Sequence, residues 1–127
     1  MSENICVHNM MLKEFGLDFF DGVRAPFSAG IELTAKCNLR CIHCYAQNER
    51  NHTDMTTEQV KQVIDTLVDH GCLSIFYTGG EVLCRKDFAE LYIYARKKGL
   101  LVSVLSNITM LTEGHIKLFT EYPITQL

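Results

Sequence analysis

Three cysteines in one short segment constrain this 127-residue chain more than any other feature. Residues 37–45 read CNLRCIHCY, so Cys37, Cys41 and Cys44 form a Cys-x-x-x-Cys-x-x-Cys pattern. A loop at the end of a strand could turn three such sulfurs towards one small inorganic group. A 4Fe-4S cluster normally takes four cysteine thiolates. Three would leave one iron with an open coordination position, which is the arrangement that distinguishes catalytic from structural metal sites.

Two other readings of the cysteines are weaker. Zinc usually takes four ligands from two separated pairs, and no second pair is visible in the sequence. Six cysteines could form a disulfide framework, but that is typical of secreted proteins, and residues 1–4 lack the basic start of a secretory signal. The pattern therefore favours an iron-sulfur cluster in a reducing cytoplasm.

Length and charge exclude several classes of protein. The 127 residues are enough for one modest domain, whereas a full eight-unit barrel takes ~250 residues. A net charge of −3 gives no electrostatic case for binding nucleic acid or an anionic membrane. No apolar run approaches the ~18 residues of a membrane span.

The apolar pattern predicts alternating strands and helices. Residues 27–34 alternate apolar and polar side chains, which indicates a strand with one apolar face. A capping box of Thr56 and Gln59 opens a helix that ends near Gly71. The order continues with a strand at 73–78, a helix at 87–99, a strand at 100–105, a helix at 112–122 and the start of a strand at 124–127. Such alternation predicts an α/β fold with a parallel sheet.

Three polar or glycine-rich segments each follow a predicted strand. They are the cysteine segment, Thr78-Gly79-Gly80-Glu81, and Ser106-Asn107. Loops that follow parallel strands lie at one edge of the sheet, where the sites of barrels and open α/β folds are found. The three loops are therefore expected to form one site. Gly79 and Gly80 lack side chains, so their backbone can approach a ligand closely.

The cysteine pattern and the Gly-Gly-Glu motif, in this order, resemble the radical S-adenosylmethionine (SAM) superfamily. The sequence around the cysteines, residues 33–45, is similar to that of the branch that includes peptide-maturing enzymes with a cysteine-rich C-terminal (SPASM) domain. The resemblance runs from about Ile31 to the end of the chain. It implies the N-terminal part of a partial (β/α)6 TIM-like barrel at residues 27–127, truncated at about the fourth strand. Residues 1–26 show only weak helical character, interrupted by Gly16, Gly22 and Pro26, and are expected to be a lead-in arm.

The resemblance also implies a cofactor set. Cys37, Cys41 and Cys44 would hold the 4Fe-4S cluster, whose open iron would bind the methionine part of SAM. An electron from the cluster would then give a 5′-deoxyadenosyl radical that removes a hydrogen atom from the substrate. Glu81 would accept hydrogen bonds from the methionine ammonium, beside Gly79 and Gly80.

Further contacts follow from the same resemblance. His43 would lie near the adenine, although packing at the edge of the loop, with Tyr45 beside it, fits equally well. Ser106 and Asn107 are similar to the family's Ser-Asn-Gly-Thr, with Ile108 in the glycine position, and either contact SAM or serve the turn. Val82 stands where the family usually has proline, which changes the stiffness of that loop.

The remaining residues singled out are expected to be structural. Cys72 suits the core, and Cys6 has no identifiable partner. Cys84 is close enough to the cluster for a ligand or redox role, but a plain packing or exposed thiol is favoured. Arg85 and Lys86 are expected to be solvated.

The function implied is that of a radical SAM enzyme acting on a peptide or protein. Its electron would come from a low-potential donor such as flavodoxin or ferredoxin, and neither nucleic acid nor membrane would be a partner. Heme-modifying and other small-molecule enzymes share similar loops. A fragment that holds a cluster or zinc without turnover is the alternative.

Overall fold

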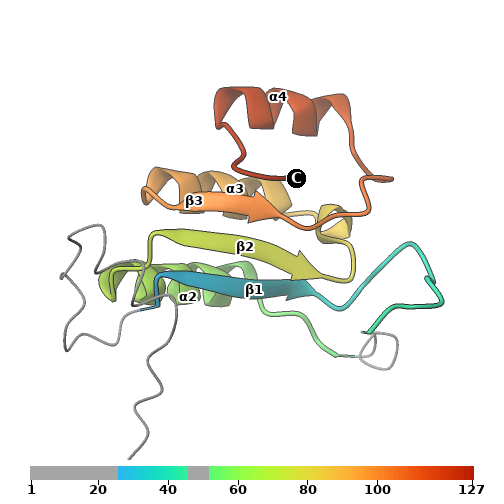
Figure 1. The fold of residues 1–127 in the computed structure, drawn as a ribbon, viewed down its shortest axis with the longest axis horizontal. Coiled ribbons are helices and arrows are strands. Elements are labelled where there is room, and N and C mark those ends of the chain that lie inside the picture. The colour runs from blue at the N-terminus through green and yellow to red at the C-terminus, as the bar shows by residue number, and fades with distance from the viewer. Residues whose placement is uncertain (1–25, 46–51) are drawn as a thin grey trace, which may run out of the picture.

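The computed structural model describes residues 26–45 and 52–127, so most of the predicted arm, with Cys6, lies outside the described residues. Its centre is a parallel sheet of three strands in the order β1-β2-β3 (Figure 1). The strands are β1 (Ser28–Thr34), β2 (Ser74–Gly79) and β3 (Leu101–Val104). The helices are α2 (Thr57–Asp69), α3 (Phe88–Lys97), α4 (Glu113–Glu121) and the short 3-10 helix η3 (Val82–Cys84).

Strand β1 has the two-residue period that the sequence predicts. Ile31 and Leu33 are buried, whereas Gly30 and Glu32 on the other face are exposed. Phe27 was expected on the apolar face, but it precedes the strand and is 39% exposed. Alternation therefore predicted Ile31, Glu32 and Leu33 correctly, whereas Thr34, expected on the polar face, is 4% exposed.

Helix α2 begins as predicted. The backbone N–H of Gln59 donates to Thr56 Oγ1 at 3.2 Å, and the N–H of Thr56 donates to Gln59 Oε1 at 2.9 Å. This capping box satisfies two of the backbone donors that a helix leaves unpaired at its start. Val60 and Ile64 then point into the core.

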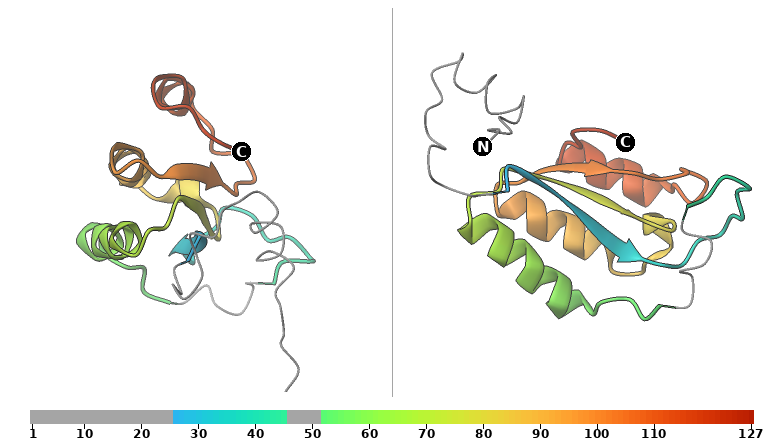
Figure 2. Two further views of the ribbon diagram at one scale, coloured as in Figure 1. Left: turned by 60° about the vertical axis from the view of Figure 1, so that its left-hand side comes forward. Right: turned by 60° about the horizontal axis from the view of Figure 1, so that its bottom comes forward.

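The three α-helices cover one face of the sheet, while the cysteine loop lies towards the other side (Figure 2). Each strand follows its predecessor across the sheet in the same direction, so right-handed crossovers place every helix on the same face. A doubly wound sheet would carry helices on both faces. The one-sided arrangement is that of a barrel wall, in which the uncovered face looks inwards.

The chain end continues the sheet beyond β3. The backbone N–H of Thr125 donates to Val102 at 3.0 Å, and that of Val104 donates to Gln126 at 2.8 Å. Ser103 and Gln126 form an isolated parallel bridge. The strand predicted at 124–127 is therefore present only as a bridge, at the position that the predicted order requires.

Two further observations concern the core and the length of the helices. Cys72 is 4% exposed and belongs to the core, as predicted. Among residues 26–45 and 52–127, no helix is both long and apolar enough to cross a membrane.

Candidate functional site

The loops that follow β1, β2 and β3 lie at the same edge of the sheet, where the strand arrows point in Figure 1. The first carries the cysteines, the second carries Gly80 and Glu81, and the third carries Ser106 and Asn107. The structure thus brings the predicted loops together. Hydrogen bonds join each of them to a neighbour.

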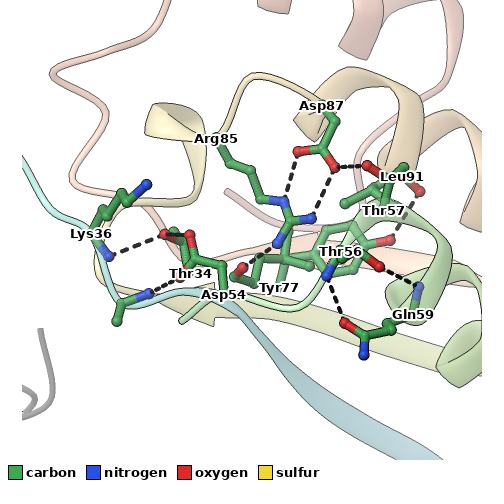
Figure 3. A network of polar contacts seen from close by, with 12 residues as sticks. Thr34, Lys36, Asp54, Thr56, Thr57, Gln59, Tyr77, Arg85, Asp87 and Leu91 are labelled. Atoms are coloured by element: carbon green, nitrogen blue, oxygen red, sulfur yellow. Dashed lines mark hydrogen bonds and ion pairs between the residues drawn. The ribbon is translucent and has the colours of Figure 1, made fainter. Parts of the chain in front are cut away.

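The start of the cysteine loop is fixed by Asp54 (Figure 3). Its carboxylate accepts from Thr34 Oγ1 at 2.8 Å and from the backbone N–H of Ala35 at 2.9 Å. Thr34 Oγ1 in turn accepts from the N–H of Lys36 at 3.0 Å. Sequence reasoning missed Asp54, which lies about 20 residues along the chain from the backbone that it holds.

The Gly-Gly pair packs directly on this fixed backbone. A Cβ on Gly79 would lie 2.3 Å from the carbonyl oxygen of Thr34, and a Cβ on Gly80 would lie 2.1 Å from that of Lys36. The N–H of Gly80 donates to Thr34 and that of Glu81 donates to Lys36, both at 2.8 Å. The close partner of these glycines in the structure is the protein's own cysteine loop.

Glu81 is fully buried and faces the third loop. Its Oε1 accepts from the N–H of Leu83 at 3.0 Å and from Ser106 Oγ at 2.8 Å. Its Oε2 accepts from the backbone N–H of Asn107 at 2.7 Å. A buried carboxylate is costly unless hydrogen bonds satisfy it, and these three donors do so. Glu81 therefore ties the second loop to the third.

Asn107 connects the third loop to the cysteine loop. Its Nδ2 donates to Asn38 Oδ1 at 3.1 Å and lies 3.9 Å from Cys37 Sγ. Its Oδ1 accepts from the N–H of Thr109 at 3.0 Å, and Asn38 Nδ2 donates to Thr109 Oγ1 at 2.8 Å. Neither Asn38 nor Thr109 was among the predicted site residues.

The three cysteines of the motif are half-buried thiols. The backbone N–H of Leu39 donates to Cys37 Sγ at 3.4 Å, and that of Cys44 donates to the Cys41 carbonyl at 3.2 Å. In the described part of the chain, no three His, Cys, Asp or Glu side chains are placed so that they could hold a metal ion. The thiols therefore share one loop without being gathered around a common point.

This loop nevertheless suits a metal cluster by its chemistry. Residues 35–45 contain no helix or strand, so the backbone between Cys37 and Cys44 can rearrange without breaking either. Thiolate sulfur is the ligand that iron-sulfur clusters take. Metal binding is commonly coupled to ordering of the ligands, and the bonds of Thr34, Ala35 and Lys36 attach the start of this loop to the rest of the fold.

The residues around the last cysteine point to solvent. His43 is exposed, Ile42 is 97% exposed and Tyr45 is 75% exposed. The packing role considered for His43 and Tyr45 is therefore not observed.

Cys84 lies in η3, half-buried against the cysteine loop. Burial and then the Glu81 carboxylate raise the pKa of its thiol, while the backbone amide of Asn38 acts in the opposite direction. A raised pKa favours the neutral thiol, and the thiolate is the form that binds metal. This environment agrees with the packing role predicted for Cys84.

Arg85 is the main error of the sequence reasoning, which placed it in solvent. Its side chain is only 8% exposed. Nη1 donates to the Leu33 carbonyl at 2.6 Å. Nε and Nη2 donate to the Asp87 carboxylate at 2.7 and 2.9 Å (Figure 3). Thr57 Oγ1 also donates to Asp87, at 2.6 Å. These contacts join β1, α2 and the start of α3. They also leave Asp87, predicted to open α3, at the N-cap without a side-chain capping bond.

Asp87 predicts a pH dependence of stability. The hydrogen bonds from Arg85 lower the pKa of Asp87 to about 2. Since the folded pKa lies below the ordinary value of 3.8, the carboxylate contributes stability above pH about 4 and loses it as the pH falls towards about 2. Asp87→Asn should therefore flatten the acid limb of the free energy of unfolding, measured in urea between these values. Asp69→Asn, at the exposed end of α2, should leave that limb in place.

The left-handed backbone conformation of Ile108 leads us to expect that glycine would stabilise the fold at this position. Ile108 has φ +58° and is 54% exposed, at the position where the resemblance has glycine. A left-handed conformation costs an L-residue roughly 1–2 kcal/mol, and glycine avoids this cost. Glycine also loses more backbone entropy on folding, which offsets about 0.5–1 kcal/mol of the gain. Ile108→Gly should raise the free energy of unfolding by up to about 1 kcal/mol. Ile116→Gly, equally exposed but within α4, should lower it by about 1 kcal/mol.

Comparison with known proteins identifies the family of the chain. The sequence profile of the radical SAM superfamily matches residues 31–127. The chain belongs to the radical SAM superfamily. The match covers all three loops of the site and begins within β1.

Curated relatives of this radical SAM chain modify both peptides and porphyrins, according to their names. Fe-coproporphyrin III synthase of Methanosarcina barkeri is 38% identical over 70% of this chain and 23% of its own. The antilisterial bacteriocin subtilosin biosynthesis protein AlbA of Bacillus subtilis is 36% identical over 76% of this chain and 22% of its own. PqqA peptide cyclase of Bradyrhizobium diazoefficiens is 32% identical over 72% and 24%. The matched part is thus about a quarter of each relative.

A solved structure confirms the fold. SuiB of Streptococcus suis, bound to the precursor peptide SuiA, has a TM-score of 0.74 and 17% identity, covering 98% of this chain and 29% of SuiB. The predicted fold class, the N-terminal part of a partial TIM-like barrel in the radical SAM superfamily, is therefore confirmed, as is the resemblance to peptide-maturing members. The boundary between an arm at 1–26 and the core remains a prediction.

Proposed function

We propose that Cys37, Cys41 and Cys44 hold a 4Fe-4S cluster and that the chain forms part of an enzyme that cleaves SAM. The observation that carries the proposal is the joining of the cysteine loop to the Gly-Gly-Glu loop through Thr34 and Lys36. When bound, the cluster would supply the electron that cleaves SAM into methionine and a 5′-deoxyadenosyl radical. The protein's part is to hold the ligands, orient SAM and shield the radical from solvent.

The methionine end of SAM would lie beside Gly79 and Gly80. These glycines border a cavity of about 380 Å³ whose wall also includes Glu32, Thr34, His52 and Asp54. The Cβ positions of the two glycines face the carbonyls of Thr34 and Lys36, so a ligand would contact the glycine backbone from the side of the cavity. His43 would make a further SAM contact that the family resemblance implies. For Ser106 and Asn107 we favour the alternative role in the turn, because their side chains already bond Glu81, Asn38 and Thr109.

Glu81 requires a change of environment to serve as a SAM ligand. According to the resemblance, the Glu81 carboxylate would accept hydrogen bonds from the methionine ammonium of SAM. In this structure Glu81 is fully buried and accepts from Leu83, Ser106 and Asn107. A carboxylate has about four lone-pair positions, so one further donor could be accommodated if the loop opened. We therefore assign SAM contact to the backbone of Gly79 and Gly80 first and to Glu81 second.

The substrate class proposed is a peptide or protein in the course of maturation. The names of AlbA and of the PqqA cyclase support it, and the name of the M. barkeri porphyrin enzyme supports a heme precursor as the second candidate. A flavodoxin or ferredoxin in the cytoplasm would supply the low-potential electron. No role in nucleic-acid or membrane binding is proposed.

A module that holds a cluster or zinc without turnover is the competing function. The chain spans about a quarter of its curated relatives, and the thiols of the described residues are not gathered as a metal site. The two functions differ in one reaction. Oxygen-free protein given SAM and a chemical reductant should release 5′-deoxyadenosine and methionine. Iron-loaded protein that leaves SAM intact would favour the module.

A further inference from the structure

The hydrogen bonds around Asn107 determine which way its side-chain amide faces. The backbone N–H of Thr109 can only donate, and it points at the atom assigned as Asn107 Oδ1, 3.0 Å away. Thr109 Oγ1 lies 2.6 Å from the same atom and also accepts from Asn38 Nδ2. The oxygen of Asn107 therefore faces Thr109, and its NH₂ group faces the cysteine loop.

The NH₂ group has two hydrogens and two neighbours to receive them. One neighbour is Asn38 Oδ1 at 3.1 Å, and the other is Cys37 Sγ at 3.9 Å. Asn38 cannot turn its own nitrogen to Asn107, because that nitrogen donates to Thr109. Asn107, Asn38 and Thr109 thus form a closed ring of hydrogen bonds, from which one amide hydrogen is left for the sulfur.

The loop maintains this position against a conformational cost. Ile108, the next residue, adopts φ +58°, which is a genuine outlier for a β-branched side chain. The N–H of Asn107 donates to Glu81 at 2.7 Å and that of Ile108 donates to Ser106 Oγ at 2.8 Å. Strain of this kind persists only where the surroundings impose it, and it is concentrated at functional sites.

We propose that Asn107 is a positioning residue that donates its amide N–H to the sulfur of Cys37 and thereby raises the reduction potential of the cluster held there. The inference rests on the proposed function. Hydrogen bonds to the cysteine sulfurs are one of the factors that set the potential of an iron-sulfur cluster, because they stabilise the additional negative charge of the reduced state. The N–H of Leu39, 3.4 Å from the same sulfur, is the second donor.

Two variants separate this role from a purely structural one. Asn107→Asp keeps the shape and the acceptor for Thr109, but it replaces the donor NH₂ with a charged oxygen. Asn107→Ala removes the donor without adding charge. Gln62→Glu, on an exposed position of α2, adds the same charge away from the site and is the control.

The measurement is a redox titration of the reconstituted protein without oxygen, followed by electron paramagnetic resonance. The midpoint potential should become more negative in Asn107→Ala and more negative still in Asn107→Asp, with Gln62→Glu unchanged. Unchanged potentials in both Asn107 variants would overturn the inference. Loss of iron from both would also overturn it, because the cluster would then need Asn107 in order to bind at all. If the wild-type protein holds no cluster, it is the proposed function that fails.

Discussion

Replacing Cys41 with alanine is expected to reduce 5′-deoxyadenosine formation to background, a loss of at least about 100-fold. Losing an outer partner of a metal ligand already costs ~10–100-fold in affinity or activity, and here a ligand itself is lost. Two thiolates would remain for a cluster that normally takes four cysteines. The measurement is chromatographic detection of 5′-deoxyadenosine after anaerobic incubation with SAM and reductant, alongside the iron content.

Two other cysteines provide the controls for this result. Cys72 is buried in the core away from the loops, so Cys72→Ala should keep both iron and product, with some loss of stability. Cys84→Ala should likewise keep its iron if Cys84 is only a packing thiol. Product formation by Cys41→Ala at the wild-type rate would refute the ligand assignment.

Replacing Gly80 with alanine should strongly lower the stability of the fold. The new Cβ would lie 2.1 Å from the oxygen and 2.6 Å from the carbon of the Lys36 carbonyl. Overpacking of this kind typically costs 1–3 kcal/mol. Displacing the loop would also weaken the bond from Glu81 to Lys36, worth about 1 kcal/mol. We expect the free energy of unfolding to fall by about 2–4 kcal/mol.

The consequence of Gly80→Ala should extend to metal binding, since the displaced backbone is the start of the cysteine loop. Unfolding in urea and iron content after reconstitution measure the two effects. Gly114→Ala is the matched control, because its Cβ would meet only Thr112 Oγ1, at 3.5 Å. Within α4 it should raise stability by up to about 1 kcal/mol. Equal stability of Gly80→Ala and wild type would show that the loops are not packed as described.

The regular elements and the position of the site could be predicted from the sequence. Alternation at Ile31 and Leu33 and the capping box at Thr56 are local patterns. Such patterns are visible in the sequence because side chains in a strand or a helix return to the same face every two to four residues. The meeting of the three loops followed from the parallel sheet alone.

The contacts that fix the loops could not be predicted. Arg85 reaches the Leu33 carbonyl from 52 positions away, and Glu81 reaches Ser106 from 25. A charged residue after a glycine turn usually lies in solvent. Only the spacing of Arg85 and Asp87, two residues apart at a helix start, could have indicated an ion pair there.

The cysteine pattern indicates the type of ligand but not where the three sulfur atoms lie. It predicts three thiols of a metal-binding type, and among the described residues these are not gathered around a common point. Spacing limits how far apart ligands can lie, whereas a loop of this kind would close only when metal bonds offset the entropy cost of ordering it.

Iron and sulfide counting after anaerobic reconstitution tests the central claim most directly. We expect about four irons and about four sulfides per wild-type chain, with background values when Cys37, Cys41 and Cys44 are all replaced by alanine. A wild-type protein that, protected from oxygen throughout, takes up no iron, or that binds zinc in its place, would contradict it.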